Sequence, residues 1–138
     1  MLAASVGFNI NVVLHLIAEV AAFGPLLVFG RLWATDPEGA AKLYTRISLP
    51  ALVLLWVFGM GALGLSGSDG VDKYEMSDPW VLVSLLIWVI LVAIGVAVIM
   101  PASKQRGEDA RKRLMAGVGT THLLLVVAVI LMVFRPGS

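Results

Sequence analysis

The sequence contains no cysteine, and that absence removes several kinds of site at once. Without thiols the chain can form no disulfide, no thiolate metal site and no iron–sulfur cluster, and it cannot attach haem through a C-x-x-C-H motif. Charge is scarce as well, because only 14% of the 138 residues are Asp, Glu, Lys or Arg and the net charge is +1. So little positive charge offers no patch that could hold a nucleic acid.

Apolar residues make up 59% of the chain. Soluble domains average about 45–50% apolar and about 25% charged residues. A chain of this size cannot hide so much apolar surface from water, because small proteins bury a limited fraction of their surface. The composition therefore excludes a cytosolic enzyme, a nucleic-acid-binding protein and a disordered tail. We expect an integral membrane protein in contact with the lipid bilayer.

Four apolar segments are long enough to cross about 30 Å of hydrocarbon, which takes roughly 20 helical residues. They are Phe8–Gly30, Ile47–Leu65, Trp80–Met100 and Leu114–Phe134. Asp78 and Pro79 are typical of a helix start, and Pro101 indicates the end of the third helix. The sequence thus predicts an all-α fold, a four-transmembrane-helix bundle that residues 1–138 form as one domain.

The loops between these segments differ in charge. Segments 31–46 and 101–113 hold eight of the ten Lys and Arg residues, whereas segment 66–79 has Lys73 against four acidic residues. Under the positive-inside rule the two basic loops are cytoplasmic, so both termini lie outside. We expect this orientation in a bacterial inner (plasma) membrane.

Ionisable residues inside the predicted spans are costly and usually mark a function. Asn11, His15 and Glu19 are spaced by four residues, so they share one face of the first helix. His122 belongs to a polar interruption in the fourth helix. Counted from the helix ends, Glu19 and His122 lie near the membrane midplane, and His15 lies one turn further out. Adjacent first and fourth helices would bring the three ionisable groups together.

Several interpretations of these three residues remain open. Glu19 bonded to His15 or His122 would only fix the register of the helices. A haem b site would use His15, His122 or both as axial ligands. A quinone or proton-relay site would use Glu19 as the proton carrier, with its carboxyl uncharged at rest. Two histidines and one carboxylate could also bind a bare metal ion, although their spacing is not diagnostic.

Glycines and tryptophans in the spans have simpler predicted roles. The glycines of the second span are Gly59, Gly61 and Gly64. They let a neighbouring helix approach closely, and we expect packing there rather than ligand contact. Trp80 lies at an outer helix end, where an interfacial anchor is expected, while Trp56 and Trp88 lie inside spans.

Some stretches resemble a known group of membrane proteins. Leu14–Ile17, Phe23–Leu27 and Arg31–Leu32 resemble the first helix of the HemJ-type protoporphyrinogen oxidases and of CopD-like and other small four-helix membrane proteins. The tail Leu123–Pro136 is similar to the closing helix of the same group. The resemblance implies a haem-binding, membrane-embedded oxidoreductase in which His15 is functional.

The chain departs from the HemJ pattern in two places. That group carries a lysine in its third helix, and Trp80–Met100 has none; it also carries an Asn-Glu pair entering the fourth helix, where this chain has residues 116–119 (AGVG). Two functional classes therefore stay open. One is a small haem- or quinone-linked redox protein that uses His15, Glu19 and His122. The other is a non-catalytic accessory subunit of a larger, respiratory-type membrane complex or homo-oligomer.

Overall fold

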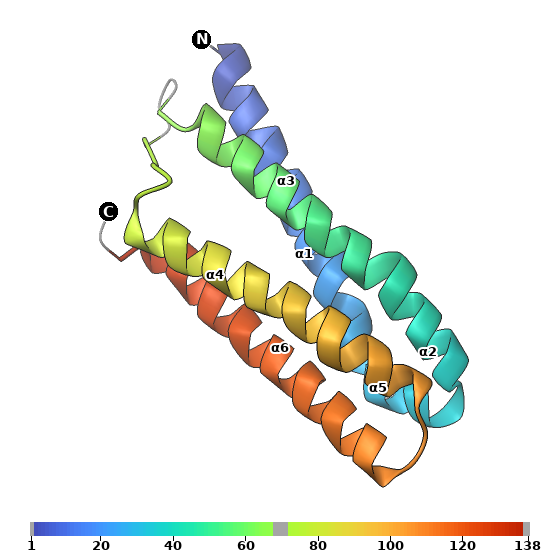
Figure 1. Cartoon of the computed structure of the whole chain (residues 1–138). Helices are drawn as coiled ribbons and strands as arrows, with labels where there is room; N and C mark the ends of the chain where they lie inside the picture. Colours follow the sequence, from blue (N-terminus) through green and yellow to red (C-terminus); the bar gives the residue numbers. More distant parts are fainter. Residues whose placement is uncertain (1, 68–71, 137–138) are drawn as a thin grey trace.

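The computed structural model describes residues 2–67 and 72–136, whose regular structure is helical (Figure 1). It forms four rods. The first rod is α1 (Leu2–Thr35), and the second consists of α2 (Pro37–Leu43), the π-helical turn η1 (Tyr44–Ser48) and α3 (Leu49–Leu65). The third consists of α4 (Pro79–Ile94), the π-helical turn η2 (Gly95–Ile99) and α5 (Met100–Lys104), and the fourth is α6 (Glu108–Phe134).

Each of the four rods is long and apolar enough to cross a membrane, which confirms the predicted all-α bundle of four transmembrane helices. The rods extend beyond the predicted segments, because a helix ends where its backbone is interrupted and not where its side chains become polar. α1, for example, continues past Gly30 to Thr35. It stops at Asp36, since the residue before a proline disfavours the helical conformation. The Asp36 carboxylate then starts α2 by accepting the Gly39 N–H at 3.0 Å.

The expectation that Pro101 ends the third helix is wrong, because the rod continues to Lys104. The turn before it is π-helical, with the Met100 N–H bonded to the Gly95 carbonyl five residues back. Proline has no N–H, and its ring crowds the carbonyl four residues earlier. A wider turn accommodates that crowding without a break in the rod. Pro50 follows η1 at the same spacing.

The start of α4 agrees with the prediction in position but not in bonding. Asp78 is the N-cap residue and Pro79 is the first helical residue. The Asp78 carboxylate, however, accepts the backbone N–H of Glu75 at 2.9 Å and makes no bond to the helix. The acidic side chain thus stabilises the preceding turn. Proline suits the first position, because a missing N–H needs no partner there.

The four rods are arranged as two hairpins that meet at one end of the molecule (Figure 1). α1 runs alongside α3 in the first hairpin, and α4 runs alongside α6 in the second. The hairpins are closest around α2 and α5, which form the closed end of the molecule. They diverge toward the open end, where both termini lie.

Buried aromatic side chains join the hairpins at the closed end. Tyr44 of η1 is packed so closely against Gly95 of η2 that a Cβ atom there would collide with the phenol oxygen. Phe29 meets the Tyr44 ring edge-on, with the ring centroids 6.0 Å apart. The indole N–H of Trp33 donates to the carbonyl of Ser103 at 3.1 Å and so ties the end of α1 to α5. Packing and hydrogen bonding together fix this junction.

The close approach of α1 to α3 depends on glycine at two of the three expected positions. A Cβ atom at Gly59 would lie 3.1 Å from the His15 ring, and one at Gly61 would collide with the Asn11 side chain. Gly64 faces open space, so the predicted packing role is wrong there. At the other two positions glycine lets the neighbouring helix approach as predicted.

The outward faces of the rods are apolar. Val20, Leu27 and Leu123 are 71%, 76% and 64% exposed, whereas Ala18 and Ala22 are buried between helices. Large exposed apolar surfaces are rare on proteins that live in water. These faces are compatible with contact to a lipid bilayer, in which helices satisfy their own backbone hydrogen bonds.

Candidate functional site

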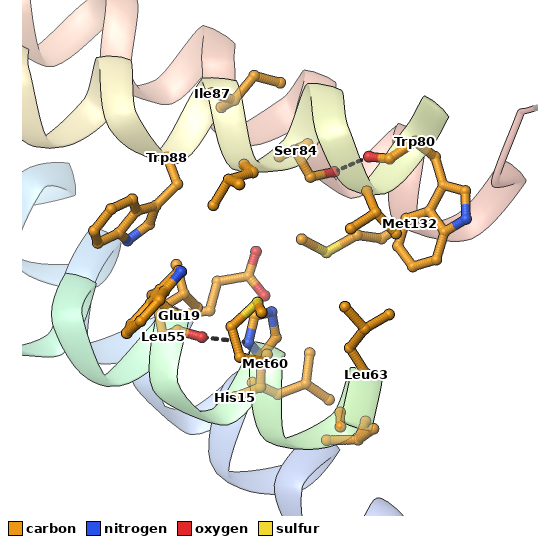
Figure 2. A pocket seen from close by; sticks show the side chains of 18 of the residues that line it. His15, Glu19, Leu55, Met60, Leu63, Trp80, Ser84, Ile87, Trp88 and Met132 are labelled. Atoms are coloured by element: carbon orange, nitrogen blue, oxygen red, sulfur yellow. Dashed lines mark hydrogen bonds between the residues drawn. The ribbon is translucent and has the colours of Figure 1, made fainter. Parts of the chain in front are cut away.

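A cavity of about 320 Å³ lies between the diverging hairpins (Figure 2). α1 and α3 form one side of its wall, and α4 and α6 form the other. Most of the lining side chains are aliphatic or methionine. The lining residues with polar or aromatic chemistry include His15, Glu19, Trp56, Trp80, Ser84 and Trp88. An apolar cavity with a few convergent polar groups is the usual form of a small-molecule site.

His15 lines the cavity from α1 with a fixed ring orientation. Its Nδ1 lies 2.8 Å from the backbone carbonyl oxygen of Leu55 in α3. A carbonyl only accepts, so Nδ1 carries the proton and donates it in this bond. Nε2 is then left with a lone pair that can accept a proton or bind a metal. The contact with Gly59 shows why the ring can reach so close to the α3 backbone.

Glu19 lies one helical turn after His15 on the same face of α1, as the spacing predicts. Its carboxyl group points into the cavity beside the His15 ring (Figure 2). The described residues supply no hydrogen-bond partner for this carboxyl, so its oxygens are available to a molecule in the cavity. A carboxyl and an imidazole next to each other can exchange protons with a bound molecule.

Three tryptophans, Trp56, Trp80 and Trp88, line the cavity, and the sequence interpretation missed this role. Trp56 and Trp88 stack with their centroids 5.9 Å apart and their planes at 29°. The Trp88 indole N–H donates to the carbonyl of Leu52 at 2.7 Å, so this side chain links α4 to α3. The sequence does contain a pattern that predicts part of this wall, because Trp80, Ser84 and Trp88 are spaced by four residues and share one face of α4.

A network around Tyr74, in the loop before α4, packs against Trp80, which lines the cavity. Tyr74 packs edge-on against Trp80, with the ring centroids 5.3 Å apart. The guanidinium of Arg135 donates to the Tyr74 hydroxyl, lies 4.8 Å over its ring and comes within 3.8 Å of the Asp72 carboxylate. The end of α6 is thereby tied to the loop before α4, which contributes Met76 to the cavity wall.

His122 does not join His15 and Glu19 at the cavity. It lies on α6, is absent from the cavity wall, and its Nε2 is buried with no hydrogen-bond partner among the described residues. The expectation that adjacent first and fourth helices gather three ionisable groups is therefore wrong. α1 packs mainly against α3 and touches α6 over a short stretch. Accordingly, the described residues contain no group of three His, Cys, Asp or Glu side chains that could hold a metal ion.

Asn11, the third polar residue on the α1 face, has a packing role. Its amide nitrogen donates to the Gly7 carbonyl of its own helix at 2.9 Å, and its side chain fits against Gly61. The candidate site thus consists of His15 and Glu19 in an apolar cavity lined by tryptophans.

No protein-family model matches this chain, and no curated protein or solved structure matches it either. A function must therefore be inferred from the cavity.

Proposed function

We propose that the cavity binds a quinone-type lipid and that His15 and Glu19 exchange protons with its ring oxygens. The observation that carries this proposal is the bond from His15 Nδ1 to the Leu55 carbonyl, 2.8 Å long. That bond leaves Nε2 as a proton acceptor, one turn from a carboxyl that faces the same apolar cavity.

The chemistry of a quinone fits these two groups. A protonated Glu19 donates a hydrogen bond to a quinone carbonyl, and His15 Nε2 accepts one from a quinol hydroxyl. The stacked Trp56 and Trp88 rings offer a flat aromatic surface beside these polar groups. A quinone reaches such a site through the bilayer, where intramembrane ionisable residues commonly mark proton pathways.

Electrons have to come from a redox partner, because these side chains move only protons. The proposed role is therefore a quinone-binding subunit within a larger, respiratory-type membrane complex. A purely structural accessory subunit is the alternative. That role would explain the broad apolar surface, but it gives no function to the neighbouring His15 and Glu19 side chains in the cavity.

Haem b is the second candidate for the cavity, and the resemblance to HemJ-type proteins favours it. The bond from His15 Nδ1 to Leu55 is the kind of support that commonly orients a metal-binding imidazole. His15 alone would supply a nitrogen ligand to the iron, since His122 is not on the cavity wall. A bound haem would supply one-electron chemistry. Glu19 would then sit beside the ligand as a proton donor.

Variants of Glu19 test the quinone proposal. The probe is decylubiquinone, added to detergent-solubilised protein, with binding followed by quenching of tryptophan fluorescence. Glu19→Gln can still donate to a quinone carbonyl and should retain most of the affinity. Glu19→Leu loses that hydrogen bond and should weaken binding about tenfold. His122→Leu, which alters a residue outside the cavity, is the matched control and should bind as the parent does.

Two results would contradict the quinone proposal. One is unchanged affinity in the Glu19→Leu variant, which would place the ligand elsewhere. The other is a Soret absorption band in the purified parent protein that shifts on reduction and disappears in a His15→Leu variant. That second result would assign the cavity to haem.

We further propose that the closed end faces the cytoplasm of a bacterial-type cell, with both termini outside. Eight of the ten Lys and Arg residues lie in segments 31–46 and 101–113 at the closed end, which is the distribution that sets orientation. Cysteine introduced at Asp72 should react with a membrane-impermeant reagent from outside. Cysteine at the exposed positions Glu38 or Glu108 should react only after the membrane is opened; the reverse pattern would invert the orientation.

A further inference from the structure

A second hollow, of about 460 Å³, lies at the closed end and shares no lining residue with the His15–Glu19 cavity. It is formed by α2 and η1 from the first hairpin and by α5 and the turn after it from the second. Its basic lining residues are Lys42, Arg46, Lys104 and Arg106. Glu38 is the one acidic residue among those that line it.

The positive charges of this hollow are mostly unneutralised. Glu38 pairs with Lys42 at 3.7 Å on the exposed face of α2. Among the described residues, no ion pair joins Arg46, Lys104 or Arg106 to a carboxylate. Folding therefore brings three cations from two separate hairpins around one space. The mutual repulsion of these cations opposes the junction of the hairpins. An anion bound between them would replace this repulsion with a net electrostatic attraction.

The position of the hollow indicates which anion it would meet. It lies where the spans Pro37–Leu65 and Pro79–Lys104 reach their basic ends, which is the level of lipid headgroups for rods that cross a bilayer. Ile47 directly follows Arg46 and is 45% exposed, so apolar surface adjoins the basic residues. A ligand with a phosphate group and acyl chains matches both surfaces.

We propose that this hollow binds the phosphate group of an anionic phospholipid through Arg46, Lys104 and Arg106. A guanidinium presents paired donors to phosphate oxygens, and the lysine adds a mobile point charge. Basic hollows between transmembrane helices on the cytoplasmic side are suited to such headgroups. Because the cations come from both hairpins, one phosphate would bridge the two. This proposal does not depend on what occupies the His15–Glu19 cavity.

The test compares two charge-matched double variants of the full chain in detergent. Arg46→Gln with Lys104→Gln removes two cations from the hollow. Arg111→Gln with Lys112→Gln removes two from the first turns of α6, at the same end but outside the hollow. Bound phosphatidylglycerol and phosphatidylcholine with the same acyl chains are counted by native mass spectrometry. All four positions are exposed, so circular dichroism should show both variants folded.

We expect the parent to retain phosphatidylglycerol in preference to phosphatidylcholine. Each cation near a membrane surface contributes about fivefold to the binding of an anionic lipid, so the hollow variant should bind about 25-fold more weakly. The α6 variant should change by less than about threefold, because exposed charges outside contact distance are screened. Equal losses in the two variants would overturn the proposal, since they would show only diffuse attraction to the basic end.

A separate arm distinguishes lipid from free phosphate. Thermal unfolding is measured in lipid-free detergent with millimolar inorganic phosphate, with phosphatidylglycerol, or with chloride at matched ionic strength. Stabilisation by phosphatidylglycerol alone supports the lipid site. Equal stabilisation by inorganic phosphate, lost in the Arg46→Gln with Lys104→Gln variant, would assign the hollow to free phosphate and overturn the lipid assignment.

Discussion

Each hairpin carries one histidine within its membrane-spanning length, and the two histidines are held in opposite ways. His15 in the first hairpin donates to the Leu55 carbonyl of the neighbouring helix and lines the cavity beside Glu19. His122 in the second hairpin has a buried Nε2 with no partner among the described residues and lies off the cavity wall. Two histidines predicted at similar depths in the membrane therefore differ in their chemistry, because the neighbouring helix determines what each imidazole contacts.

The hairpins also differ in what holds them together. In the first, Gly59 and Gly61 admit the side chains of α1 directly against the α3 backbone. In the second, Gly119 of α6 faces open space, and the glycine contact is at Gly117, which meets Ile99 of η2. The two ionisable groups of the cavity, His15 and Glu19, are thus set in the more closely packed hairpin, and the second hairpin supplies a mostly aromatic and aliphatic wall.

The largest expected effect comes from widening the first hairpin. Gly61→Leu places a bulky side chain against Asn11, so we expect a loss of about 3 kcal/mol in the free energy of unfolding. Gly64→Leu is the matched control, since a Cβ there meets nothing. Thermal unfolding in detergent measures both. A Gly61→Leu protein as stable as the parent would show that this face of α3 looks at lipid.

Replacing the two histidines tests the comparison directly. His15→Leu removes the bond to Leu55 and should lower the free energy of unfolding by about 1–1.5 kcal/mol. His122→Leu removes a buried nitrogen that has no partner in the described part of the chain, so it should be neutral or stabilising. Unfolding in mixed micelles of rising dodecyl sulfate content gives both values. Equal destabilisation would mean that His122 has a partner outside the chain.

The smallest effect concerns the link between the hairpins. Trp88→Phe loses the indole bond to Leu52, which joins α4 to α3, and should cost about 1 kcal/mol. Trp80→Phe makes the same change of ring size but loses no hydrogen bond, because the Trp80 Nε1 has no partner among the described residues. The difference between the two variants in the same unfolding assay isolates the indole bond. A larger loss at Trp80 would contradict this assignment.

The sequence was sufficient for the parts of the structure that depend on one helix alone. Length and apolarity predicted the four rods, and the four-residue spacing of His15 and Glu19 predicted their common face. Helix pairing was not predictable, because a polar face does not indicate which neighbour it meets. The assumed contact of the first and fourth helices therefore misplaced His122. The prediction that the third helix ends at Pro101 failed for a related reason. The rule that proline ends a helix assumes regular α-helical turns and does not anticipate a wider π-helical turn before the proline.

The tryptophan wall was missed because an aromatic residue inside a span suits core, lipid and ligand equally well. Its role depends on Trp56 and Trp88 meeting across two hairpins, which no pattern within one segment encodes. The basic hollow was missed for the same reason, because its residues come from both hairpins. Arg46 lies in η1 and Lys104 at the end of α5, and only the junction of the two hairpins brings them to one space.

The contact of Tyr44 with Gly95 joins the hairpins at one end of the molecule, so a small change of angle there becomes a large displacement at the open end. α6 contains 27 residues, which at 1.5 Å per residue is a rod of about 40 Å. A rotation of about 5° at one end of such a rod displaces the other end by roughly 3–4 Å, about the thickness of an aromatic ring. In each hairpin a π-helical turn before a proline lies at the closed end, so the separation of the hairpins at the open end depends on the geometry of the opposite end.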